Sequence, residues 1–150
     1  VQKELRLLLK EGGTIAVAVH GTAQGVPYFS TIMEPVLKCM PDIRPEGAPT
    51  VHRFGDPKDL ENVLTAAGFA GVAVRKFVFD YEAGTFSEYW SDYMSTTAAA
   101  IRPKIEAGGL QIVAEIKKEA EEKAQCFVKN DGRIMFPWDV LVATATTTKS

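Results

Sequence analysis

Hydrophobic residues recur along the chain in an order that predicts helices alternating with β-strands. Leucines at helical spacing precede a Gly-Gly pair, which predicts a helix over residues 1–10. The run Thr14–Val19 has no charged residue and is rich in β-branched side chains. Such a run is typical of a strand that is buried on both faces, usually in a parallel sheet. Pro27–Met40 returns to helical spacing, with Pro35 expected to kink or divide the helix.

The rest of the chain continues the same alternation. Its predicted elements are a helix that Asp56 caps and Gly68 ends, a strand over Val72–Phe79, an aromatic-rich helical segment over Thr85–Ile105, a helix over Leu110–Val128 and a last strand over Ile134–Thr147. Pro137 predicts an edge position or a bulge at the start of that strand, because proline cannot donate to a sheet ladder. This order indicates an α/β protein, but three strands are too few for a complete doubly wound sheet.

Composition and charge narrow the possible classes of function. Of the 150 residues, 46% are hydrophobic and 24% charged, which is ordinary for a folded domain and excludes a disordered chain. The net charge of −2 leaves no basic surplus to neutralise a phosphate backbone, so we expect no nucleic-acid partner. No apolar run reaches the roughly 18 residues that a membrane span needs, so we expect no membrane partner.

The two cysteines, Cys39 and Cys126, stand alone and far apart in the sequence. Neither lies in a Cys-x-x-Cys pair or a Cys/His cluster, so no metal site is expected. A disulfide framework would need more cysteines in a chain of this length. We therefore expect two reduced, mostly buried thiols in a cytoplasmic protein.

Four segments follow one another in an order that matches a known arrangement of helices and strands. L-L-K-E-G-G-T-I-A-V-A-V-H-G (Leu8–Gly21) gives a helix end, a glycine turn and a strand, and F-G-D-P-K-D-L-E-N-V-L-T-A-A-G-F (Phe54–Phe69) leads into the strand Gly71–Phe79. With F-P-W-D-V-L-V-A-T-A (Phe136–Ala145), they resemble the fifth to seventh strands of class I S-adenosylmethionine-dependent methyltransferases. F-S-E-Y-W (Phe86–Trp90) is similar to the helical cap after strand six in ubiquinone-biosynthesis-type small-molecule methyltransferases.

The resemblance implies an α/β fold with part of a Rossmann-like methyltransferase sheet. That sheet would be three-stranded and mixed, with the last strand antiparallel in the middle. Its order would be Thr14–Val19, then Ile134–Thr147, then Val72–Phe79. The helical cap insertion would span about residues 85–108 of a single domain that covers residues 1–150.

The resemblance covers only the carboxyl-terminal half of that family's fold. In the family, the cofactor lies against a glycine-rich turn after the first strand, and an acidic residue ending the second strand holds the ribose. Here Gly12-Gly13 precedes a strand, and Gly108-Gly109 precedes a helix with no strand before it, so neither pair can serve. We therefore expect this chain alone to bind S-adenosylmethionine weakly or not at all.

The candidate cofactor contacts are His20 and Gly21, which directly follow the strand Thr14–Val19. Open α/β sheets place their ligands at this end of a strand. His20 could act as a general base or as a hydrogen-bond partner of a substrate. The resembling family often carries an aromatic residue here, which favours a role in shape and stacking over proton transfer.

A substrate pocket is the second candidate site, and aromatic residues of the cap segment dominate it. The residues expected to line it are Phe29, Arg53, Phe86, Trp90 and Tyr93. The alternative is that these aromatic side chains pack on the sheet as ordinary core. No residue is identified as catalytic, because methyl transfer from a sulfonium depends on positioning more than on acid–base help.

Two functions remain open from the sequence. The first is the substrate-side half of an S-adenosylmethionine-dependent methyltransferase that acts on a small molecule and is inactive alone. The alternative is a non-enzymatic, self-assembling interaction or small-ligand-binding module. The chain begins inside a helical pattern without Met, so we expect either a fragment or a natural short protein, and a glycine-rich strand–turn–helix encoded upstream would decide for the first.

The strand Thr14–Val19 also predicts a partner. In the resembling family this strand has a neighbour on both sides, and one of those neighbours is missing here. A run without charge or proline leaves an edge that templates pairing with another chain. We therefore expect a homodimer or a complex with a complementary chain, joined through this strand edge.

Overall fold

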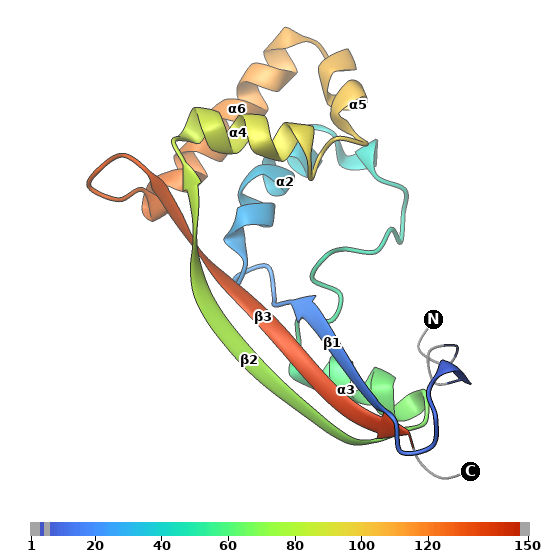
Figure 1. The fold of residues 1–150 in the computed structure, drawn as a ribbon. Helices are drawn as coiled ribbons and strands as arrows, with labels where there is room; N and C mark the ends of the chain where they lie inside the picture. Colours follow the sequence, from blue (N-terminus) through green and yellow to red (C-terminus); the bar gives the residue numbers. More distant parts are fainter. Residues whose placement is uncertain (1–3, 5–6, 148–150) are drawn as a thin grey trace. The chain divides into compact units, whose positions relative to one another are not determined.

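The computed structural model describes residue 4 and residues 7–147 (Figure 1). In chain order, the elements are β1 (Thr14–His20), α2 (Pro27–Cys39), a 3₁₀ turn (Pro41–Ile43), α3 (Pro57–Ala66), β2 (Phe69–Gly84), α4 (Phe86–Ser95), α5 (Arg102–Ala107), α6 (Leu110–Ala124), a 3₁₀ turn (Gln125–Phe127) and β3 (Ile134–Thr147). Of the helix predicted over residues 1–10, residues 1–3, 5 and 6 lie outside the described residues. The bounds of β3 are those that the sequence predicts, whereas β2 extends beyond the predicted Val72–Phe79 at both ends.

The three strands form one sheet in the order β1-β3-β2. β1 pairs with β3 antiparallel, with Thr14 opposite Thr146 and His20 opposite Val140. β2 also runs opposite to β3, so the last strand of the chain lies in the middle and is antiparallel to both neighbours (Figure 1). The predicted strand order and fold class are confirmed.

β1 is less buried than the sequence predicts. Thr14, Ala16 and Ala18 are exposed, whereas the intervening apolar side chains are half-buried. β1 has β3 as its only neighbour in the sheet of the described residues, and it packs on one face alone. The lack of charged residues in β1 means that both of its faces could be buried. Which face is buried depends on the elements that pack against it.

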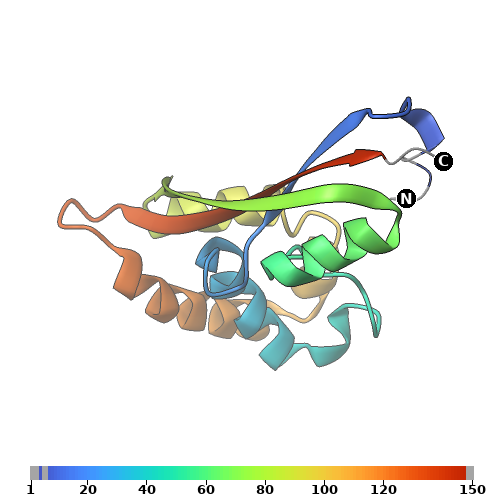
Figure 2. The same cartoon turned by 90° about the horizontal axis from the view of Figure 1, so that it is seen from below.

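The described chain divides into two compact units that share the long strands β2 and β3. The first unit holds the described residues up to 25 together with residues 50–79 and 139–147, and the second holds residues 26–49 and 80–138. In the first unit α3 covers one face of the sheet (Figure 2), burying Leu60 and Leu64 against Leu141. The second unit has its own core, in which α6 packs against α2 and α4.

The predicted cap segment, about residues 85–108, lies wholly in the second unit. It forms two helices, α4 and α5, where the sequence pattern predicts one continuous helical stretch. Pro103 lies in the first turn of α5, the helical position where the missing amide hydrogen of proline costs least. Pro35, by contrast, is accommodated within the single helix α2.

One further prediction needs correction. Cys39 is half-buried but Cys126 is exposed, because α6 ends at Ala124 and the 3₁₀ turn that follows does not keep the α-helical period. Pro137 lies near the start of the central strand but in an edge position, as predicted. β1 pairs only with residues 140–146, so β3 has no β1 partner at Pro137. Among the described helices, none is long and apolar enough to cross a membrane.

Candidate functional site

The predicted cofactor contacts are His20, the last residue of β1, and Gly21, which begins a loop that is fixed to β3. The amide of Gly21 donates to the carbonyl of Asp139 at 2.9 Å. The amide of Asp139 in turn donates to the carbonyl of Gly25 at 2.9 Å. The backbone of a single residue of β3 therefore holds both ends of this loop.

The Asp139 side chain closes the space inside the loop. A Cβ on Gly21 would lie 2.5 Å from the Cβ of Asp139, and a Cβ on Gly25 would lie 2.7 Å from its Cγ. Asp139 is only 8% exposed, and the Lys76 Nζ lies 2.5 Å from its Oδ2. The buried carboxylate thus has a cation beside it while it packs on glycine backbone.

The two histidines lie at the same loop. His52 Nδ1 is 2.8 Å from the carbonyl oxygen of Gly21, and a Cβ on Gly55 would lie 2.6 Å from the Gly21 carbonyl carbon. Burial, followed by the nearby His52 ring, lowers the pKa of His20 below its usual range. A neutral His20 can donate or accept a hydrogen bond at pH 7. His52 is half-buried in this contact.

Arg53 follows His52 in the first unit, and its guanidinium carbon lies 5.4 Å from the centre of the Phe54 ring. Its side chain is exposed. The other predicted pocket residues, Phe29, Phe86, Trp90 and Tyr93, all belong to the second unit.

Within the second unit, Phe29 and Tyr93 belong to a cluster of rings around Tyr28. Tyr93 is fully buried and its hydroxyl donates to the carbonyl of Phe29 at 3.1 Å. The Tyr28 hydroxyl donates to Asp92 Oδ2 at 2.9 Å, and burial together with this carboxylate raises the pKa of Tyr28. The hydroxyls are thus satisfied within the core, and the rings contribute apolar packing.

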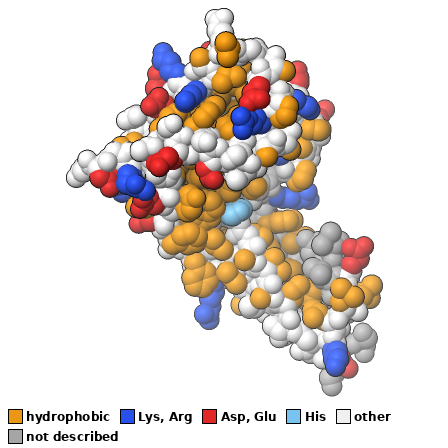
Figure 3. Space-filling view, turned by 45° about the horizontal axis from the view of Figure 1, so that its top comes forward, with side chains coloured by type: hydrophobic (Ala, Val, Ile, Leu, Met, Phe, Trp, Pro, Cys, Tyr) orange, Lys and Arg blue, Asp and Glu red, His pale blue; other side chains and the backbone are white. Residues whose placement is uncertain are grey.

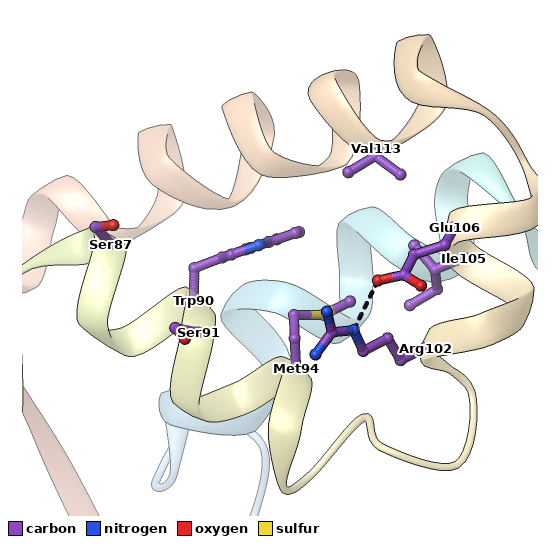
Figure 4. Close-up of a pocket in the computed structure, with 8 residues that line it drawn as sticks. All are labelled: Ser87, Trp90, Ser91, Met94, Arg102, Ile105, Glu106 and Val113. Atoms are coloured by element: carbon purple, nitrogen blue, oxygen red, sulfur yellow. Dashed lines mark hydrogen bonds and ion pairs between the residues drawn. The ribbon is translucent and has the colours of Figure 1, made fainter.

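Phe86 and Trp90 lie together on α4, with their ring centres 6.3 Å apart. Trp90 also lines a cavity of about 190 Å³ between α4, α5 and α6 (Figure 4). The lining residues, from the three helices in turn, are Ser87, Trp90, Ser91, Met94, Arg102, Ile105, Glu106 and Val113. We call this cavity the cap pocket.

The cap pocket combines apolar walls with a polar side. Trp90 presents its ring toward the cavity, and Met94 and Val113 supply aliphatic surface (Figure 4). On the other side, Arg102 Nε pairs with Glu106 Oε1 at 2.7 Å. Lys117 Nζ lies 5.9 Å from the centre of the Trp90 ring. A ring with aliphatic neighbours and a few polar groups is what small apolar ligands need from a site.

Sequence reasoning found Trp90 but missed the other walls of the cap pocket. Met94 lies four residues after Trp90 and so shares its helical face. Helical spacing in the sequence could therefore have identified Met94 as a second wall of the pocket. Val113 comes from a different helix, so no local pattern reveals it. Asp139 was missed because its contacts with Gly21 and Gly25 join residues far apart in the chain.

The residues of the loop after β1 do not by themselves fit S-adenosylmethionine. Asp139 fills the space beside Gly21 and Gly25, and Gly55 packs on the same backbone, so no cradle opens there. For a metal, the described part of the chain holds no group of three or more His, Cys, Asp or Glu side chains that could bind one.

No protein family matches the chain by sequence profile, and none of the curated proteins matches it by sequence. Among solved structures, the fold is similar to that of a protein from Bacillus halodurans C-125 described as a "putative methyltransferase". The TM-score is 0.50 at 16% sequence identity. The match covers 99% of this chain but only 62% of the other, so the chain spans less than two thirds of that protein's length.

Proposed function

We propose that this chain is the substrate-side half of a class I S-adenosylmethionine-dependent methyltransferase that acts on a small molecule. The observation that carries the proposal is the sheet, whose last strand is antiparallel between the other two. The helices α4, α5 and α6 join β2 to β3, where the cap of the resembling family also lies. The fold likeness to the Bacillus halodurans protein supports the same assignment.

The cap pocket supports the proposal that the methyl-accepting substrate is a small apolar molecule. A cavity of about 190 Å³ has room for a compact ring system, and Trp90 offers a face for stacking. Its ionisable lining residues, Arg102 and Glu106, are paired with each other. The pocket is thus suited to binding and orienting a substrate, which is the main requirement of methyl transfer.

In this proposal the cofactor site is completed by a glycine-rich half that this chain does not provide. The chain contributes His20 and Gly21 at the edge of that site. The closed packing around Asp139 is the reason to expect weak or no binding of S-adenosylmethionine by the chain alone. Two free thiols fit the cytoplasmic location that we also propose.

The test is to read the coding sequence upstream of Val1, express the whole reading frame and titrate it with S-adenosylmethionine by calorimetry. We expect an upstream glycine-rich strand–turn–helix, one cofactor site in the whole product and no measurable site in the 150-residue chain. A tight site in the short chain, or an upstream region without that half, would contradict the proposal.

A second candidate, a non-enzymatic assembly module, is favoured by the edge of β1. β1 pairs on one side only among the described strands, and alternate residues along it are exposed. We propose that a complementary chain or a second copy pairs with this edge. Amides of residues 14–19 that exchange as slowly in the isolated chain as those of β3 would show that the edge is already covered.

A further inference from the structure

The opposite edge of the sheet carries an apolar stretch that the proposed function does not use. β2 is a strand of 16 residues that pairs with β3, and among the described residues no strand lies on its other side. Residues 75–82 are exposed on both faces of the strand. Phe77, Val78 and Phe79 are 51%, 62% and 49% exposed. Hydrophobic side chains reach the protein surface in the space-filling view as well (Figure 3).

A strand edge that exposes apolar side chains tends to pair with another strand. Native edges are usually protected by proline, bulges or inward-pointing charges, whereas residues 77–79 contain only aromatic and β-branched side chains. Such a stretch can pair with a second strand that supplies both backbone hydrogen bonds and an apolar surface.

The sequence of the stretch is complementary to itself when reversed. It reads R-K-F-V-F-D-Y-E, with Arg75 and Lys76 before the apolar centre and Asp80 and Glu82 after it. A second copy that runs antiparallel brings its acidic end beside the basic end of the first. Opposite charges across strands stabilise such a pair, whereas a parallel copy would place like charges together.

Symmetry then fixes the register. Directly opposed residues of paired strands point to the same face of a sheet. A two-fold axis perpendicular to the sheet places the same residue of both copies on the same face. The axis must therefore pass between one residue and the same residue of the other copy. Centring on Val78 places Lys76 opposite Asp80 and Phe77 opposite Phe79 of the other copy.

We propose that β2 pairs edge to edge with β2 of a second copy of this chain, antiparallel and centred on Val78. On one face of the pair, four phenylalanine rings meet, and Arg75 lies opposite Tyr81, a favourable arrangement of a cation and a ring. On the other face, Val78 meets its own copy between two Lys76–Asp80 pairs. The pairing uses the edge opposite β1 and so does not depend on the proposed enzymatic role.

Existing contacts of the chain are compatible with this pairing. Lys76 already pairs with Asp139, but its side chain is 53% exposed and can accept a second carboxylate. Among the described residues, neither Arg75 nor Asp80 takes part in an ion pair. A single strand pair buries less area than a permanent dimer does, so we expect a dimer whose population rises with protein concentration.

Light scattering after size exclusion tests the assembly with two matched variants. Val78→Lys puts a charge at the centre of the pair, whereas Val51→Lys changes a valine of similar exposure, 48%, outside the strand. We expect wild type and Val51→Lys to shift from 16.4 kDa toward twice that mass on concentration, and Val78→Lys to stay monomeric. A wild type that remains monomeric up to millimolar concentration, or a folded Val78→Lys that dimerises like wild type, overturns the proposal.

Disulfide trapping tests the register and does not depend on how the lysine variant folds. In a Cys126→Ser background, Val78→Cys should form a disulfide-linked dimer readily, because residue 78 faces itself. Phe79→Cys should link much more slowly, because each residue 79 faces residue 77 of the other copy. Equal rates for the two variants would contradict pairing through β2 centred on Val78.

Discussion

Gly25 and Asp139 pack so closely in the first unit that no side chain fits between them. The carboxylate cannot move away freely, because it is buried and lies beside Lys76. We expect Gly25→Ala to lower the free energy of unfolding by about 1–3 kcal/mol, the usual cost of forcing atoms into filled space. Urea denaturation followed by circular dichroism measures this change.

The control is the double variant Gly25→Ala/Asp139→Ala. Removing the carboxylate leaves room for the new methyl group, so the two changes together should cost less than the sum of the single changes. Strictly additive losses would show that the methyl group meets something other than Asp139.

His20 gives the first unit a dependence on pH. Its pKa is lowered in the folded chain, mainly by burial, so the unfolded chain binds the proton more tightly. The stability from this residue is present above the unfolded pKa of about 6.5 and is lost as the pH falls toward the lower folded value. Urea titrations from about pH 8 to about pH 5 should show this loss, and His20→Asn should show a shallower one. Identical slopes would mean that His20 does not contribute.

At the scale of elements, the start of α4 depends on two side chains. The Thr85 hydroxyl accepts from the Glu88 amide, and Glu88 Oε2 accepts from the Thr85 amide at 2.7 Å. These bonds satisfy amides that the start of a helix otherwise leaves without partners. The Thr85 amide and, after it, the Thr85 hydroxyl donate to the Glu88 carboxylate and lower its pKa.

We expect Thr85→Ala to lower the free energy of unfolding by about 1 kcal/mol, the typical value for a lost helix cap. Ser87→Ala is the matched control, because Ser87 is an exposed hydroxyl residue in the same turn but is not the capping residue. Thermal denaturation compares the two variants. Equal shifts in melting temperature would show that the hydroxyl of Thr85 does not cap α4.

At the scale of the whole molecule, β3 is the element that the rest of the sheet depends on. It has neighbours on both sides, and Leu141, Ala143 and Ala145 along it are each at most 1% exposed. We expect its amides over residues 140–146 to exchange with solvent more slowly than any in β1, because opening them breaks the sheet. Hydrogen exchange of a dilute sample, where edge pairing is weak, measures this order, and faster exchange in β3 than in β1 would contradict it.

Local sequence patterns determined much of the element list. Asp56 predicts the start of α3 because its carboxylate precedes a proline and can accept a hydrogen bond from an amide of the first helical turn. The structure confirms this, since the Asp56 side chain accepts from the Lys58 amide. The β-rich run that ends the chain gives β3 its bounds. The charged residues after Phe79 hid the full length of β2, because an edge strand needs no apolar side chains to continue its backbone ladder.

The tertiary structure alone decided how these elements meet. The sequence by itself specified the helices and strands, because periodicity and capping depend on residues a few positions apart. The order of the strands in the sheet came from the resemblance to a known family. The sequence could not show that Asp139 closes the loop at Gly21 and Gly25, or that Val113 joins Trp90 in the cap pocket. Those contacts join residues that are distant in the sequence, and their partners are set only when the chain folds.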